Sequence, residues 1–131
     1  MYLQMSSSAI NLLIHLSFIS QIIPGYKINV KSNSIVEAES SFGSIFRYMY
    51  GESRKETITY IGDIITKVIE IAPKEDRNTQ ICLIEALRKS IEGIINLKTT
   101  YENDIYYLAK LSSEILRIEH FIKGMCEIDK C

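Results

Sequence analysis

The chain has 131 residues, which suits one domain, and its 15 Lys and Arg nearly balance its 16 Asp and Glu. Because the charges balance, no overall field favours nucleic acid or a membrane surface as a partner. Isoleucine is abundant and falls mostly at helical spacing among charged residues, so the composition predicts an all-α fold.

The N-terminal 25 residues have the character of a secretory signal peptide. An apolar stretch over Ala9–Ile23 is followed by Pro24 and Gly25, a turn and a small residue that suit peptidase cleavage. The stretch is shorter than the roughly 20 residues of a spanning helix, so no membrane insertion is expected. We interpret 1–25 as a signal peptide and 26–131 as the mature helical domain. The alternative is a buried helix in a retained N-terminus, because no basic residue precedes Lys27.

Two helices are expected in the first half of the mature domain, after a linker over residues 26–36. Apolar residues three and four positions apart predict a helix over Glu37–Tyr50 and a stronger one over Ser53–Ile69. Ser53 and Glu56 form a capping-box pattern at the start of the stronger helix, where each side chain satisfies a backbone N–H. Its inward residues are expected to be Ile58, Ile61, Ile64, Ile65 and Val68.

The second half predicts a short strand and two longer helices. The strand is expected over Val68–Ala72, an apolar run around one carboxylate that Pro73 brings to an end. The helices are expected over Asn78–Leu97 and Glu102–Met125, and the short connection Lys98–Tyr101 predicts that they are antiparallel neighbours. Their inward residues are expected to be Leu83, Ile84, Leu87, Ile91, Ile94 and Ile95, then Ile105, Leu108, Leu111, Ile115, Ile118 and Ile122.

The three cysteines of the chain determine which disulfide bonds it can form. Cys82 and Cys126 bracket the two long helices, and because an antiparallel hairpin returns to its starting level, we expect both at the same end of the bundle. That placement permits a bond within the chain, or a reciprocal pair of bonds between two chains. Cys131 is the odd cysteine, which suggests an additional intermolecular link or a free thiol. The alternative is that all three are reduced in an intracellular protein.

No catalytic or metal-binding pattern is recognisable in the sequence. It lacks a glycine-rich phosphate loop, His-Glu-x-x-His and Gly-x-Ser-x-Gly, and Cys126 and Cys131 lack a second ligand pair for zinc. We therefore expect neither enzymatic activity nor a cofactor, and we interpret His120 as a surface histidine. Tyr101, Tyr106 and Tyr107 predict either an aromatic recognition patch or a cover over one end of the core.

Several short motifs together resemble the short-chain helical cytokines, most closely the interleukin-5 family. They are the apolar leader with Ile14–Phe18, Lys55-Glu56-Thr57 at a helix start, the expected strand, Arg77-Asn78-Thr79-Gln80-Ile81-Cys82, and Cys126 after the last helix. The resemblance covers roughly residues 53–126. It implies a helical cytokine bundle, secreted to the extracellular space, that acts as a growth and differentiation factor on leukocytes such as eosinophils and B cells.

The resemblance also implies partners and the residues that bind them. It implies a homodimer in which Cys82 of each chain is bonded to Cys126 of the other, and a receptor with a specific α subunit and a shared signalling subunit. Glu56 matches the family residue that contacts the shared subunit. The positions that match residues binding the specific α subunit are Arg77, Asn78, Thr79 and Glu127.

The likeness has one large gap, because the family has another strand and a fourth helix after the position of Cys126. Either the chain is a truncated form, or Glu37–Tyr50 fills the empty place in the bundle. Two alternatives remain. The first is an interleukin-2-like monomeric cytokine with an internal Cys82–Cys126 bond. The second is an intracellular all-helical interaction protein in which Leu12, Leu13, Leu16 and Ile22 pack as a further core helix.

Overall fold

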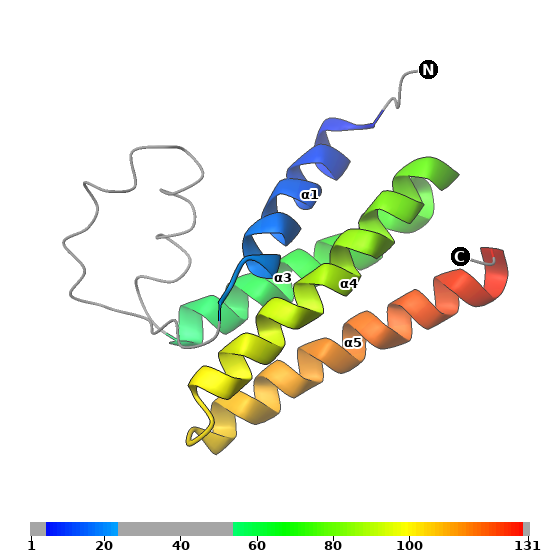
Figure 1. Cartoon of the computed structure of the whole chain (residues 1–131). Helices are drawn as coiled ribbons and strands as arrows, with labels where there is room; N and C mark the ends of the chain where they lie inside the picture. Colours follow the sequence, from blue (N-terminus) through cyan, green and yellow to red (C-terminus); the bar gives the residue numbers. More distant parts are fainter. Residues whose placement is uncertain (1–4, 24–53, 130–131) are drawn as a thin grey trace, which may run out of the picture.

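The computed structural model describes residues 5–23 and 54–129, and within these ranges the chain is all-α, as predicted (Figure 1). The expected linker and the expected helix over Glu37–Tyr50 lie outside the described residues, as do Ser53 and Cys131. The elements are α1 (Ser7–Ser20), α3 (Arg54–Ile71), the 3₁₀ turn η2 (Ala72–Lys74), α4 (Arg77–Thr100) and α5 (Ile105–Asp129).

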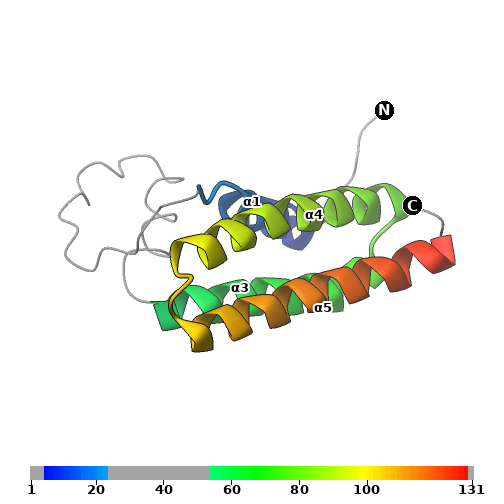
Figure 2. The same cartoon turned by 60° about the horizontal axis from the view of Figure 1, so that its bottom comes forward.

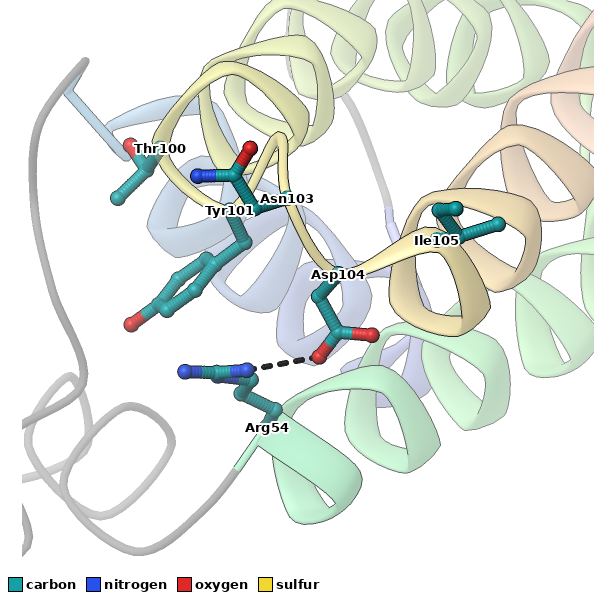
Figure 3. A pocket seen from close by; sticks show the side chains of 6 residues that line it. All are labelled: Arg54, Thr100, Tyr101, Asn103, Asp104 and Ile105. Carbon is teal, nitrogen blue, oxygen red and sulfur yellow. Dashed lines mark hydrogen bonds and ion pairs between the residues drawn. The ribbon is translucent and has the colours of Figure 1, made fainter.

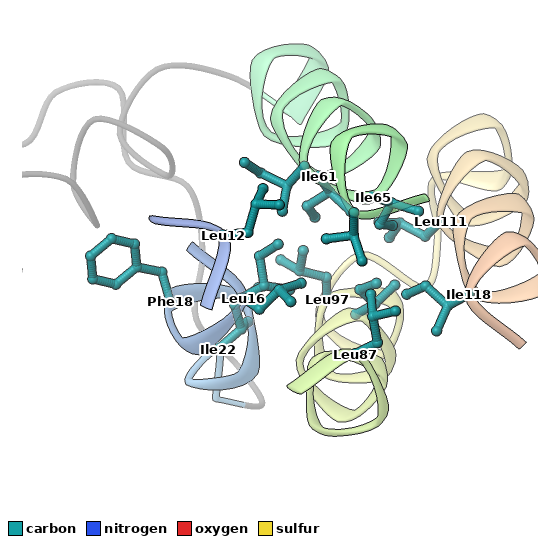
Figure 4. Packing of buried hydrophobic residues seen from close by; sticks show 14 of the residues in the cluster. Leu12, Leu16, Phe18, Ile22, Ile61, Ile65, Leu87, Leu97, Leu111 and Ile118 are labelled. Atoms are coloured by element: carbon teal, nitrogen blue, oxygen red, sulfur yellow. The ribbon is translucent and has the colours of Figure 1, made fainter. Parts of the chain in front are cut away.

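The described helices form a bundle in which α3 and α4 are each contacted by both α1 and α5. Figure 4 looks along this bundle and shows α1 and α5 on opposite sides of it. Arg54 at the start of α3 is paired with Asp104 just before α5, so α3 and α5 run in the same direction. Tyr101, which follows α4, lies under the same arginine, so α4 runs antiparallel to both (Figure 2).

Helix α3 extends through the segment for which a strand is expected, so that prediction is wrong. The chain stays helical to Ile71 and then makes the 3₁₀ turn that contains Pro73. Ile61, Ile65, Val68 and Ala72 are all buried, and their spacings of four, three and four residues place them on one helix face. Packing on that face overrides the β preference of the branched side chains.

Aspartate side chains begin both long helices. Asp76 accepts a hydrogen bond from the Thr79 backbone N–H at 2.8 Å at the start of α4, and Asp104 accepts one from Tyr107 N–H at 3.0 Å at the start of α5. Two inward predictions are wrong. Ile105 is 80% exposed because it lies off the buried face of α5, which Tyr107 and Leu111 begin, and Ile95 is exposed on the outer face of α4.

The buried core joins all four described helices into one cluster, shown in Figure 4. Both long helices and α3 contribute most of the aliphatic residues expected from their periodicity. Helix α1 and the residues just after it contribute five large buried side chains to the same core. These five are Leu12, Leu16, Phe18, Ile19 and Ile22.

The contact between α1 and α4 is a close backbone crossing. A Cβ atom placed on Gly93 of α4 would lie 1.8 Å from the Ile19 carbonyl oxygen, so only glycine fits there. Asn96 Nδ2 donates to the Ile22 carbonyl oxygen at 2.8 Å, and Ser6 Oγ donates to Glu75 Oε1 at 2.7 Å. This packing corresponds to the alternative of a retained N-terminal helix; cleavage after residue 25 stays a prediction. Within the described part of the chain, no helix is long and apolar enough to span a membrane.

His15 makes a polar side-chain contact between α1 and α3, and it makes the bundle sensitive to pH. Its Nδ1 is hydrogen-bonded to the Tyr60 hydroxyl, and the two ring centroids are 5.5 Å apart. Burial, and after it the positive charge of Lys67, lowers the pKa of His15 below 6.5. The neutral ring is therefore favoured in the folded state, and its contribution to stability is lost as pH falls below about 6.5 through the lowered pKa.

We expect the melting temperature to fall between about pH 7 and pH 5, and to fall less in His15→Phe, which keeps an aromatic ring that does not titrate. Thermal melts at both pH values measure this difference. Asp76 and Asp104 have pKa values lowered below 3.8, so neither contributes to the change in this window. The same decrease in both proteins would contradict a role for His15.

Candidate functional site

A groove follows the outer surface where α3 and α5 run side by side. Its volume is about 730 Å³. The half-buried Ile58 and the ring of Tyr107 supply its apolar lining, and charged side chains from both helices supply the rest. The exposed charged residues on its rim are Arg54, Lys55, Asp63 and Lys110. Such a mixture suits contact with another molecule's surface.

One end of the groove is built on Arg54, which Figure 3 shows beside Asp104 and Tyr101. Arg54 Nη1 lies 2.7 Å from Asp104 Oδ2, and its guanidinium carbon lies 4.5 Å from the centroid of the Tyr101 ring. Tyr101 in turn contacts Tyr107 edge to face, with centroids 5.4 Å apart. A second cavity of about 550 Å³ opens on the other side of this cluster, beside Ile105.

The protonation states of this cluster follow from its contacts. The Tyr107 backbone N–H and then the Arg54 guanidinium lower the pKa of Asp104, so its carboxylate is ionised at neutral pH. Burial raises the pKa of Tyr107, whose hydroxyl stays protonated. That hydroxyl is buried and makes no hydrogen bond within the described ranges. The cluster therefore holds a fixed ion pair and a neutral phenol, and neither is poised as a base.

The other end of the groove is closed by Arg117 of α5. Its Nη2 donates to the Gly62 carbonyl oxygen at 2.9 Å, and its Nη1 donates to Thr66 Oγ1 at 2.9 Å. The same Nη2 lies 2.6 Å from Glu114 Oε1. A Cβ on Gly62 would lie 3.1 Å from Glu114 Oε2, so glycine at this position makes room for the pair. Arg117 thus joins the backbone of α3 to α5.

Tyr106 is an aromatic residue of the groove that is available to a partner. Its side chain is 73% exposed, and Lys110 Nζ lies 5.4 Å from its ring centroid. The predicted aromatic patch is thus divided, since Tyr106 faces solvent while Tyr101 and Tyr107 cover the end of the core. Among the described residues, no group of three or more His, Cys, Asp or Glu is placed to hold a metal ion.

Glu56, which the family resemblance assigns to the shared receptor subunit, lies at the other end of the bundle from Arg77, Asn78 and Thr79, which it assigns to the specific α subunit. Glu56 is exposed in the first turn of α3, while Arg77 is half-buried and Asn78 is exposed at the start of α4, at the other end of the bundle. Thr79 is only 1% exposed, so its side chain offers no surface to a partner. Glu127 falls within α5, but its side chain lies outside the part that the structure describes.

The cysteines do not form the internal pair. Cys82 is a free, half-buried thiol beside Leu13 and Leu16 in the crevice between α1 and α4, so the internal Cys82–Cys126 bond is absent. Cys126 lies on α5, 3.8 Å from Arg88 Nη2, and is not bonded to Cys82. A Cys82–Cys126 bond between two chains stays a prediction.

Comparisons with known proteins give no relative. No family model matches the chain, no curated protein matches it, and no solved structure matches its fold.

Proposed function

We propose that the chain is a non-catalytic helical interaction protein that binds another protein through the groove between α3 and α5. The observation that carries this proposal is Tyr106, an aromatic side chain that is 73% exposed on the rim of a groove about 730 Å³ in volume. Tyrosine and arginine are enriched among the few residues that supply most of the energy of protein interfaces. Arg54 and Arg117 stand at the two ends of this groove, each already fixed by an ion pair.

The fixed geometry favours binding because little conformational freedom remains to be lost. Arg54 is held between Asp104 and the Tyr101 ring, and Arg117 is held by the α3 backbone. Association costs about 0.5–1.5 kcal/mol for each flexible side chain that it orders. The mixed charges of Lys55, Asp63 and Lys110 would orient the partner more than they would add affinity.

We expect Tyr106→Ala to weaken partner binding by about 30-fold, the effect of losing an interface residue worth about 2 kcal/mol. Because the side chain is exposed, the melting temperature should change little. Partners retained by the wild type and lost by the variant would be purified and titrated by calorimetry. Ile81→Ala, an exposed isoleucine on α4, is the matched control. Equal affinity of the Tyr106 and Ile81 variants for the purified partner would refute the assignment of the groove.

The second candidate function is the secreted cytokine, as a disulfide-linked homodimer acting on a leukocyte receptor. The apolar N-terminal stretch and the Arg77–Cys82 motif favour it. The helix directions weigh against it, because cytokine bundles run up-up-down-down with two long crossovers, whereas α3 and α4 are antiparallel and joined by a short turn. Expression in mammalian cells, with N-terminal sequencing of any protein in the medium and non-reducing gels, distinguishes the two candidates.

A further inference from the structure

The groove between α3 and α5 has the dimensions of one extended segment of polypeptide. Its lining residues on α3 run from Arg54 to Thr66, which corresponds to a length of about 18 Å at about 1.5 Å per helical residue. Its volume of about 730 Å³ therefore gives a mean cross-section of about 40 Å². An extended strand needs about 4.8 Å by 10 Å, whereas a helix about 10 Å across needs roughly twice that area. The groove thus admits about five or six residues of extended chain.

Positive charge gathers at the end of the groove where Tyr106 lies. The ion pairs of the two arginines are neutral, so the remaining charges of the lining are Lys55, Lys110 and Asp63, and within the described ranges none of these forms an ion pair. Lys55 lies in the first turn of α3, and the Lys110 ammonium lies 5.4 Å from the Tyr106 ring centroid. Asp63 lies about 12 Å beyond Lys55 along the axis of α3. The groove is therefore basic beside Tyr106 and acidic farther along.

An apolar floor lies beside these lysines. The half-buried Ile58 is three residues after Lys55 on the same face of α3, and the buried ring of Tyr107 contributes from α5. Alternate residues of an extended chain lie about 7 Å apart on the same side. An acidic residue and an apolar residue two positions away therefore reach different parts of the groove, so the lining suits a segment that combines carboxylates with an apolar side chain.

We propose, on the basis of the interaction function proposed above, that the groove binds an extended acidic segment of the partner protein, with its carboxylates beside Lys55 and Lys110. Complementary charge orients such a segment and disfavours basic ones. Asp63 repels any carboxylate at the far end, so the acidic residues lie in one half of the segment. The same aspartate disfavours single-stranded nucleic acid, whose negative charge repeats at every nucleotide.

Selection of random dodecapeptides displayed on phage, with the full chain as the target, tests the chemistry of the segment. We expect the recovered peptides to be enriched in Asp and Glu relative to the starting library. A synthetic peptide of the most enriched sequence should bind more weakly as salt rises, and more weakly to Tyr106→Ala. Recovery of apolar or basic peptides, recovery of no peptide, or equally tight binding of an oligothymidylate would overturn the proposal.

Two charge reversals test the position of the acidic residues. Lys55→Glu with Lys110→Glu should weaken binding of the acidic peptide by about 30-fold, because two attractive contacts become repulsive. Lys89→Glu with Lys123→Glu, at exposed lysines outside the groove, makes the same change in net charge and should alter the affinity by less than about threefold. A peptide with Lys in place of its Asp and Glu should bind the first double variant more tightly than the wild type. Equal weakening by the two double variants would contradict the site.

Tyr106 separates the acidic segment from the interaction function on which it rests. Peptides without acidic residues that bind the wild type and lose affinity for Tyr106→Ala would refute the acidic segment and leave the groove as the interaction site. Acidic peptides that bind Tyr106→Ala as tightly as the wild type would place the contacts outside the groove, and would count against both.

Discussion

Replacing Gly93 by alanine is expected to lower the free energy of unfolding of the full chain by about 2–3 kcal/mol. The new methyl group would lie 1.8 Å from the Ile19 carbonyl oxygen, a backbone atom that can retreat only if α1 moves as a whole. Overpacking of this kind costs about 1–3 kcal/mol, and more where the backbone must shift. The helix propensity of alanine offsets about 1 kcal/mol of that cost. Chemical denaturation followed by circular dichroism measures the difference.

Gly124→Ala is the matched control, and the sign of its effect should be opposite. A Cβ on Gly124 in α5 meets no atom within 4 Å, so alanine there should stabilise the helix by up to about 1 kcal/mol. If α1 were removed as a signal peptide, Gly93→Ala would lose its clash and would also stabilise the protein. The comparison therefore reports whether α1 is packed on α4. Stabilisation by both substitutions in the full chain would contradict the crossing.

The positions of α3, α4 and α5 could be predicted because their buried faces repeat every three or four residues along the sequence. The wrong predictions occur where packing against the other helices, and not the local sequence, determines the structure. The Val68–Ala72 run has strand composition, but Val68 and Ala72 pack into the core on the same helix face as Ile61 and Ile65, and this packing keeps the run helical. Ile105 is an apolar residue three positions before Leu108, but the buried face of α5 runs through Tyr107 and Leu111, so Ile105 lies off that face and is exposed.

The candidate groove was harder to predict than the helices. Arg54 and Asp104 are 50 positions apart, and only the antiparallel return of α4 and α5 brings them to 2.7 Å. The sequence marks Asp104 as a residue at a helix start, whereas no local pattern marks Arg54 or Arg117 as residues of a groove. The three tyrosines were found by composition, but their division into buried and exposed rings depends on the fold. The N-terminal stretch left two alternatives because an uncharged apolar segment suits both a leader and a core helix.

Expression of residues 26–131 alone is expected to give a protein without a cooperative unfolding transition. In the full chain, α1 and the residues just after it bury Leu12, Leu16, Phe18, Ile19 and Ile22. Each large apolar side chain contributes about 1.5–3 kcal/mol when buried, so their loss removes on the order of 10 kcal/mol, an upper estimate. Single domains are stable by about 5–15 kcal/mol in total. Thermal melts, with binding of a hydrophobic dye, measure the loss.

Deleting only residues 1–5 serves as the control, because it keeps Ser6, which caps α1, and every buried residue of the helix. This shorter protein should unfold cooperatively near the temperature of the full chain. If residues 26–131 unfold as cooperatively as the full chain, α1 is dispensable for the bundle. That result would support the interpretation of residues 1–25 as a signal peptide. If they do not, a secreted form cleaved after residue 25 would expose the sides of α3 and α4 that α1 covers, and such a surface would require a second helix to cover it.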